Sequence, residues 1–567
     1  MFCLILKLHG QKSYTLSVVN TDNPSFFKKL NYKKVHASKE FAIRETQAIY
    51  QTLLNEGYLA AAIDSIRADS VRCHAFISSG LKYKWVQLSI SRPDESLMSR
   101  LGYGERLFVS RTFKYAELAR MFDKVVTYFE NNGYPFASVQ LDSFSVHENE
   151  LSAALRIKKN QFVKLDSLIL EGNTKMNKKF MFRYLGIKEG MPYNEEAFVS
   201  ASRKIKQLPF LAETKTPILK LTDKKNKLYL FLDKRNASQF DGIVGILPDD
   251  KGKTIFTGDV KIKLVNNIFH NGETFDINWR RLQSQTQDLL AHINYPYLVG
   301  LPVGVDYSIK LYRKDTSFID INNALALQYY FNGLNNIKVF YKQRNANIIS
   351  TSGLANVTVL PEYADVVTKA YGLGFTYEKF DYKFNPKRGI GINVQASVGN
   401  RVIKRNPKIN DVAYAGLSLR TGQYQAEGNV VGYINLTKNH VLKLSTLFGS
   451  VFGNTVYKNE LFRIGGLKTL RGFDEESIYA STYVIPSLEY RFLFEKNSNI
   501  FLFADGAWYE NNSVYTYVKD TPYSFGAGIN FETKAGIFTL SYGLGKQFGN
   551  SFDLRTGKIH AGLVAMF

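Results

Sequence analysis

Two hydrophobic patterns divide the chain, and one replaces the other near residue 236. Before that point apolar residues recur at helical spacing, as Phe122, Val125 and Phe129 do on one helix face. After it, apolar and polar residues alternate, which is the period of a half-buried strand. In 254–265, for example, Phe256, Val260, Ile262 and Leu264 oppose Thr257, Asp259, Lys261 and Lys263. The sequence therefore predicts an α+β region followed by a long antiparallel β region.

The α+β region contains a repeat. Tyr58, Tyr134 and Phe210 each follow a helical pattern and precede a strand pattern, and they are spaced 76 residues apart. A fixed period of this kind indicates tandem copies of one domain. We expect three modules, 13–83, 84–160 and 161–235, each in the order strand, helix, helix, strand, strand.

The β region, 236–567, predicts a closed barrel. We expect sixteen strands at 238–247, 254–265, 272–283, 286–297, 302–313, 320–331, 335–344, 369–380, 388–398, 423–437, 440–452, 481–495, 499–509, 522–532, 535–547 and 557–567. Strands of about ten residues match the span of a tilted membrane strand. An even number brings both ends to one side, and the long gaps at 345–368, 399–422 and 453–480 then share the other side. This asymmetry is typical of outer-membrane barrels.

Composition narrows the function classes. The chain has 35 Tyr and 41 Phe against 3 Trp, and it lacks an apolar run of about 20 residues, so a membrane span has to be a barrel. Cys3 and Cys73 are too few for a disulfide framework or a thiolate zinc site. The net charge is +23, but Lys and Arg are interleaved through the strands. Anionic lipid and a charged lumen explain this charge better than nucleic acid does.

The first residues, 1–12, are open to two interpretations. The stretch MFCLILKL resembles the end of a secretory signal but has no basic segment before it. It is either a signal-peptide remnant or a short first strand.

No catalytic constellation is visible. The eight histidines are scattered without metal-ligand spacing, and neither a Gly-x-Ser-x-Gly elbow nor a phosphate-binding loop occurs. We therefore expect no catalytic residues, no cofactor and no metal, and a protein that is not an enzyme.

The most specific motif lies in the gap 453–480, where a Gly-Gly pair is followed by Leu470, Arg471, Gly472 and Phe473. With the tandem modules and sixteen strands, this tetrad resembles the BamA/TamA superfamily of outer-membrane assembly barrels. The resemblance implies POTRA domains before a 16-stranded transmembrane β-barrel, and it identifies the gap as the family's sixth outer loop. Three modules suit TamA-like members better than the longer array usual in BamA.

The arginine of this motif needs acidic partners if the loop folds into the lumen. Glu489 and Asp505 lie on the predicted lumen faces of the two following strands. The resemblance implies that Arg471 meets the acidic residue of a Phe-x-Asp-x-Gly strand motif. Here that motif ends in Ala507, so we expect the arginine contact, while the local backbone packing departs from the family.

The first and last strands must meet at a seam. Phe240 and Val244 lie on the apolar face of one strand, and Ile559 and Phe567 on that of the other. Gly242, Gly245 and Gly562 remove side-chain packing there. We expect a seam that is shut at rest, because open edges are costly in lipid, and that is the easiest interval to open.

The resemblance implies an outer-membrane protein with its modules in the periplasm that folds or inserts β-barrel or autotransporter-type clients. Expected partners are unfolded outer-membrane clients, periplasmic accessory or chaperone proteins, and outer-membrane lipid, with no nucleic acid. The alternatives are a two-partner-secretion-type exporter, a passive porin with periplasmic binding modules and, more remotely, a soluble enzyme.

Overall fold

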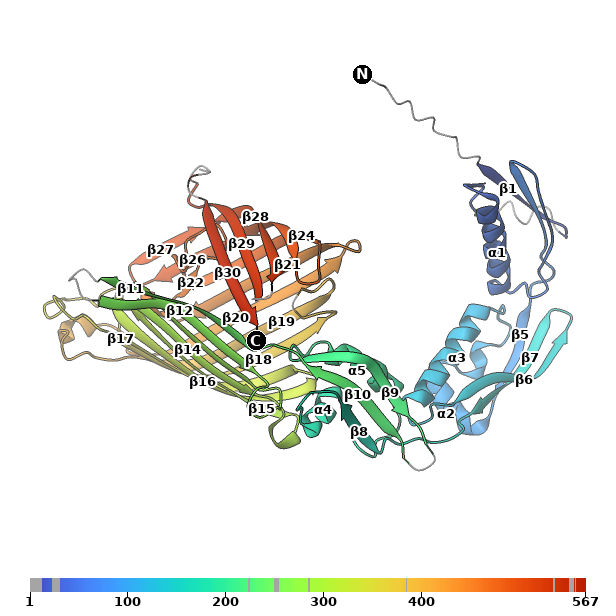
Figure 1. The fold of residues 1–567 in the computed structure, drawn as a ribbon, viewed down its shortest axis with the longest axis horizontal. Helices are drawn as coiled ribbons and strands as arrows, with labels where there is room; N and C mark the ends of the chain where they lie inside the picture. The colour runs from blue at the N-terminus through green and yellow to red at the C-terminus, as the bar shows by residue number, and fades with distance from the viewer. Residues whose placement is uncertain are drawn as a thin grey trace, which may run out of the picture. The chain divides into compact units, whose positions relative to one another are not determined.

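The computed structural model describes residues 13–22, 31–222, 225–248, 254–283, 286–383, 385–533, 536–549, 555 and 557–566. The chain forms two compact units (Figure 1). One is Met1–Leu165 with Met191–Glu196, and the other is Asp166–Gly190 with Ala197–Phe567. The predicted segment 1–12 lies outside the described residues.

The first unit holds two modules with matching sheets. Module 1 contains β1 (Tyr14–Asn20), β2 (Val35–His36), α1 (Lys39–Asn55), β3 (Ala62–Ala68) and β4 (Arg72–Ser78). Module 2 contains β5 (Lys84–Ile90), α2 (Arg92–Arg100), η2 (Glu105–Leu107), α3 (Tyr115–Glu130), β6 (Ser138–His147) and β7 (Glu150–Lys158). In both, the last strand is central, parallel to the first strand and antiparallel to its own hairpin partner. Module 2 has the predicted element order, whereas the described residues of module 1 form β2 and one helix where we expected two helices.

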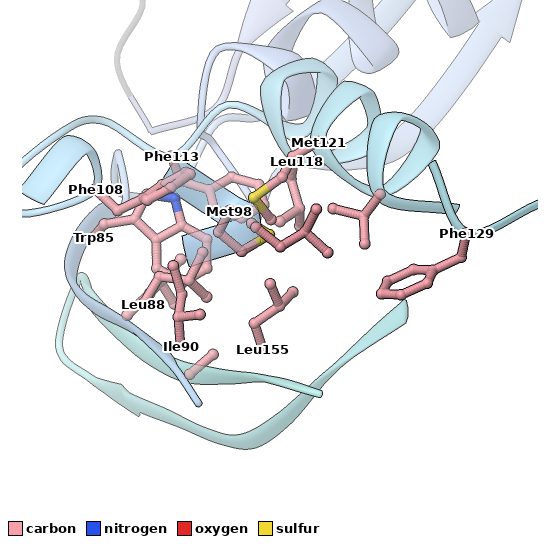
Figure 2. Packing of buried hydrophobic residues seen from close by; sticks show 14 residues of the cluster. Trp85, Leu88, Ile90, Met98, Phe108, Phe113, Leu118, Met121, Phe129 and Leu155 are labelled. Atoms are coloured by element: carbon pink, nitrogen blue, oxygen red, sulfur yellow. The ribbon is translucent and has the colours of Figure 1, made fainter. Parts of the chain in front are cut away.

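Module 2 shows why the helical pattern of the sequence produces this fold. The buried residues of α3 are Leu118, Met121, Val125 and Phe129, spaced three or four apart. They pack on the inner face of the sheet, which carries Trp85 and Leu88 of β5 and Leu155 of β7 (Figure 2). Burying an aromatic or aliphatic side chain of this size contributes roughly 1.5–3 kcal/mol.

The Gly-Tyr pairs of the repeat mark the end of a helix. Gly57 and Gly133 have φ of +98° and +99°, a region that side chains other than glycine rarely adopt. A Cβ at Gly57 would lie 2.5 Å from the backbone oxygen of Phe113. Both glycines therefore reverse the chain and admit a close neighbour, which explains why the motif recurs with the module.

The second unit begins with module 3, whose strands pair as in module 2. It contains β8 (Ser167–Glu171), α4 (Lys178–Leu185), α5 (Glu195–Ile205), β9 (Leu211–Lys220) and β10 (Lys227–Lys234), although Glu195 and Glu196 group with the first unit. Helix α4 packs against turns of the barrel. The Phe180 ring contacts Tyr297 edge-on at 5.5 Å, and Asn177 N donates to His270 O at 3.0 Å.

The barrel strands match the predicted ranges closely. They are β11 (Gln239–Pro248), β12 (Thr254–Val265), β13 (Thr274–Gln283), β14 (Thr286–Tyr295), β15 (Val303–Lys314), β16 (Phe318–Asn332), β17 (Asn335–Ile348), β18 (Val366–Phe380), β19 (Gly389–Ile403), β20 (Arg420–Asn435), β21 (His440–Phe452), β24 (Thr482–Leu493), β25 (Asn499–Gly506), β26 (Trp508–Ser513), β27 (Thr516–Asp520), β28 (Tyr523–Thr533), β29 (Gly536–Lys546) and β30 (Lys558–Met566). Short 3-10 turns η3 (Leu298–Gly300) and η4 (Asp411–Tyr414) lie between strands.

These strands close into one antiparallel barrel, in which β30 pairs with β11. β24 pairs with both β25 and β26, which are one strand interrupted at Ala507, and β27 and β28 are likewise one strand interrupted near Pro522. Within the described residues the barrel thus has the predicted sixteen strands. The predicted fold class is confirmed.

Alternation along the strands separates two faces. In β16, Leu325, Leu327 and Tyr329 are exposed on the outside, whereas Ala326 and Gln328 are buried on the inside. This is the pattern of a wall with an apolar outer surface and a polar lumen. No helix among the described residues is long and apolar enough to cross a membrane.

Candidate functional site: a loop folded into the barrel

The connection between β21 and β24 folds back into the barrel. It contains η5 (Lys458–Glu460) and the hairpin strands β22 (Phe462–Ile464) and β23 (Ile478–Ala480), with Ile464 paired directly to Ile478. We call residues 453–481 the long loop and residues 465–477 its tip. Gly465, Gly466 and Gly472 have φ of +113°, +93° and +83°, so glycine is what allows the tip to turn so sharply.

The tetrad of the tip is buried. Leu470 is fully buried, and Arg471 and Phe473 are 8% and 9% exposed. Leu470 and Phe473 join a hydrophobic cluster with Ile464, Ile478, Ala480, Tyr483, Ile485, Ala507 and Tyr509. A solvated outer loop would leave these side chains in water, so the tip has the packing of an interior segment.

Arg471 bonds to both predicted carboxylates. Its Nε and Nη2 donate to Asp505 Oδ2 and Oδ1 at 2.8 and 2.6 Å, and its Nη1 donates to Glu489 Oε2 at 2.8 Å. Nη2 also donates to Ser487 Oγ at 2.9 Å, and the guanidinium carbon lies 3.7 Å from the centroid of the Phe503 ring. A planar guanidinium can satisfy this arrangement, whereas an ammonium cannot.

The strand register brings these partners together. Ser487 of β24 lies directly opposite Asp505 of β25, and Glu489 lies opposite Phe503. All four side chains therefore face the same side of two paired strands. Glu489 also accepts from Arg491 Nε at 2.6 Å and lies 3.6 Å from Lys443 Nζ, so two carboxylates are shared among three cations.

Glycines of β29 receive the tip. A Cβ at Gly545 would lie 2.6 Å from Gly472 O and 2.8 Å from the Phe473 ring, and one at Gly543 would lie 3.0 Å from Gly472 N. Nothing in the linear pattern connects these glycines to the loop. At Ala507, where the family motif has glycine, the strand breaks, and Ala507 N donates to Pro522 O at 2.7 Å.

A second attachment of the long loop was not predicted. Arg401 of β19 forms a two-pronged pair with Glu460, with Nε and Nη2 at 2.7 and 2.6 Å from the carboxylate oxygens. Gln423 Nε2 and Tyr457 N also donate to Glu460, and both charged side chains are essentially inaccessible. Burial raises the pKa of the Tyr457 phenol to about 12, against a smaller opposing effect of the Arg401 charge, so the ring stays neutral.

Arg344 of β17 extends this attachment. It forms hydrogen bonds with both oxygens of Asp320 at 3.0 and 2.8 Å and donates to Glu460 O at 3.1 Å. Nothing in the linear sequence links positions 344 or 401 to the loop. The only available signal was the presence of arginines within strand patterns, where a buried charge needs a partner.

The seam is paired over a short length. Among the described residues, β11 and β30 share two residue pairs, Gln239 with Met566 and Phe240 with Ala565, whereas β18 and β19 pair along their whole length. Gly242, Val244 and Gly245 pair with β12, and Ile559 and Gly562 pair with β29. Of the predicted seam residues, Phe240 alone is described as pairing across the seam, and Phe567 lies outside the described residues. The expectation from the sequence was a seam that is shut at rest and that is the easiest interval to open.

Within the described ranges, no three His, Cys, Asp or Glu side chains come together in a way that could hold a metal ion. The chemistry available to the site is ion pairing, hydrogen bonding and strand pairing.

Comparison with known proteins identifies relatives of this architecture. The Omp85 superfamily domain matches residues 267–563, slightly more than half of the chain. An outer membrane protein assembly factor BamA from Nitratidesulfovibrio vulgaris (strain Hildenborough) is 20% identical over 562 residues, covering 93% of this chain and 68% of that protein.

Two solved structures share the fold. CdiB from Acinetobacter baumannii is 12% identical with a TM-score of 0.53, covering 93% of this chain and 98% of that one. CdiB from Escherichia coli is 13% identical with the same TM-score, covering 93% and 97%. At this identity the likeness concerns the fold alone.

Proposed function

Because the chain belongs to the Omp85 superfamily, we propose that it is an outer-membrane assembly factor that folds and inserts β-barrel or autotransporter-type clients. The barrel lies in the outer membrane and the N-terminal modules lie in the periplasm. The proposed reaction makes and breaks hydrogen bonds between strands. It needs no cofactor and no covalent step.

The short seam is the observation that carries this proposal. Two residue pairs join β11 to β30 among the described residues, so most of both edges has no partner strand there. An unpaired backbone group in lipid costs several kcal/mol, and an incoming client strand can supply the missing hydrogen bonds. The seam therefore offers a template within the membrane that the fully paired intervals of the barrel lack.

The modules offer a second kind of edge. In module 2, β6 is one of the two edge strands of its sheet, and its Phe144 and Val146 are about half exposed. An extended client segment can add to such an edge through main-chain hydrogen bonds. We propose that unfolded clients, delivered with periplasmic accessory or chaperone proteins, are held here before insertion.

A disulfide across the seam tests the proposal. In a Cys3→Ala/Cys73→Ala background, Phe240→Cys/Ala565→Cys should leave the barrel folded in liposomes but abolish the appearance of protease-resistant, folded client. Reductant should restore insertion. The matched control is Leu502→Cys/Ala527→Cys, a directly opposed pair of exposed residues on β25 and β28, which should insert clients at the wild-type rate.

Normal insertion with the seam locked would exclude lateral insertion. If a soluble client still crossed the membrane in that variant, a two-partner-secretion-type exporter would replace the proposal. A large, steady conductance without transport would instead indicate a passive porin.

A further inference from the structure

The tip of the long loop contacts the barrel wall on the C-terminal side of the seam. Gly472 N donates to His560 Nε2 of β30 at 3.3 Å, and Gly472 and Phe473 pack on Gly545 of β29. Leu467 lies against Gly562 of β30, with its side chain 3.7 Å from the position of a Cβ there. Arg471 also bonds to Glu489 of β24 and Asp505 of β25. All these contacts attach the tip to the last strands of the barrel.

Four residues after Gly472, the same tip contacts the wall on the other side of the seam. Arg280 Nη2 of β13 donates to Glu476 Oε1 at 3.1 Å. The second oxygen of Glu476 lies 3.1 Å from Arg463 Nη1, and Arg463 is stacked on Tyr312 of β15, 3.4 Å from the ring centroid. The Glu476 carboxylate is therefore shared between two arginines, one on the wall and one in the loop.

The order of strands around the barrel shows that these two sets of contacts lie on opposite sides of the seam. Around the closed barrel, only β11 and β12 lie between β30 and β13, and the seam is the interval between β30 and β11. The segment Gly472–Glu476 thus spans the seam from inside the barrel. We propose that this segment is a brace, with the Glu476–Arg280 contact as the bond that holds the weakly paired seam closed at rest.

The contacts on the two sides differ in strength. On the C-terminal side Arg471, Gly472 and Phe473 are buried and make several bonds, so the tip should move with β24–β30. On the other side, Glu476 of the tip forms an ion pair with Arg280 of β13. The Asp474–Lys558 pair at 2.8 Å is a further contact on the C-terminal side, to β30, and contributes little because both side chains are exposed to solvent. Parting β11 from β30 should therefore break Glu476–Arg280 first.

The inference rests on the proposed function only in supposing that the seam opens at all, and a seam measurement without client tests it directly. Spin labels at Ile277→Cys of β13 and Leu540→Cys of β29, in the Cys3→Ala/Cys73→Ala background, report the width across the seam. Both positions face outward and are exposed. Pulsed electron paramagnetic resonance in lipid nanodiscs then gives the populations of narrow and wide seams.

Glu476→Gln should raise the ratio of wide to narrow seams about tenfold, the change expected for losing one charge-assisted hydrogen bond. Arg280→Gln should also widen the seam, and the double variant should add little, because both changes remove the Glu476–Arg280 contact that they share. Protease protection of residues 453–481 should stay at the wild-type level, since Arg471 remains in place. The matched control is Glu362→Gln, which breaks the 2.9 Å pair with Lys458 of the same loop and should not change the seam.

An unchanged distance distribution in both Glu476→Gln and Arg280→Gln would overturn the brace, whatever the seam disulfide does to insertion. If Glu476→Gln did not fold, Arg280→Gln on the wall would decide the question alone. A wider seam in Glu476→Gln and Arg280→Gln, together with the wild-type distance distribution in Glu362→Gln, establishes the brace. If client insertion were then insensitive to the seam disulfide, the proposed function would fail while the brace stood.

Discussion

At the scale of single residues, Arg471 of the long loop contacts two carboxylates and an aromatic ring in the candidate site. Arg471 bonds to Asp505 and Glu489 and stacks on Phe503. Removing one partner of a buried ion pair commonly costs about 3–5 kcal/mol, because the other charge is left without compensation. Arg491 and Lys443 still flank Glu489, so Asp505 is the group that loses most.

We expect Arg471→Ala to destabilise the barrel by about 2–4 kcal/mol, somewhat below the usual cost of breaking a buried pair. Arg471→Lys should recover only part of this, since an ammonium cannot bond to both carboxylates in the same plane. The measurements are thermal unfolding in detergent and protease access to residues 453–481. Arg405→Ala, which breaks an exposed pair with Asp411, is the control and should be nearly neutral. Wild-type protection in Arg471→Ala would contradict the anchoring role.

At the scale of elements, the long loop is attached to the barrel wall at two separate places. Glu460, in the first part of the long loop, bonds to Arg401 of β19 and Arg344 of β17. The tip contacts β24, β25 and β29. The two attachments are different in kind. The attachment at Glu460 is a buried ion pair with additional hydrogen bonds around it. The attachment of the tip combines an ion pair with close backbone packing on glycines.

The Arg401–Glu460 pair provides a test of the first attachment. Glu460→Leu leaves the Arg401 charge buried without its carboxylate and should cost about 3–5 kcal/mol, measured as a lower unfolding temperature. Arg401→Met/Glu460→Leu removes both charges and fills similar volume, so it should be markedly more stable than the single variant. Equal losses in the two variants would show that Gln423 and Tyr457, rather than the missing charge, dominate the energetics.

At the scale of the whole molecule, we expect the long loop to limit what the barrel can conduct. Side-chain and backbone groups of the long loop contact β13, β15, β17 and β19 as well as the last strands. A wall of sixteen strands would otherwise enclose an aqueous channel. Together with the periplasmic modules, this occupancy is what we expect to distinguish the protein from an open pore.

Conductance in planar bilayers should therefore be small and unsteady. Replacing residues 465–477 by Asn-Gly should raise it severalfold, because Ile464 and Ile478 are directly opposed and a two-residue turn can close that hairpin. The variant removes the tip and preserves β22 and β23. A large, steady conductance in the unmodified protein, unchanged in this variant, would contradict a loop-filled lumen.

The local patterns of the sequence predicted most of the architecture. Strand bounds from alternation fall within a few residues of β12 and β21, and the repeat predicted the element order of module 2. The sequence also indicated Glu489 and Asp505 as partners of Arg471, because charged residues on the inner face of a strand need opposite charges nearby, whereas it did not indicate Ser487. The miss in module 1 concerned one helix, for which the sequence analysis gave no pattern of its own.

The sequence by itself determined the classes of element, their order and the polarity of each face, since period and composition are properties of neighbouring residues. Only the tertiary structure decided which distant residues meet. Barrel closure and strand register determine these contacts. They are the Arg401–Glu460 pair, the packing of Gly472 on Gly545, the short pairing at the seam and the Glu476–Arg280 contact. These are global geometric conditions, and a linear pattern carries no signal of them because the same alternation is compatible with many registers.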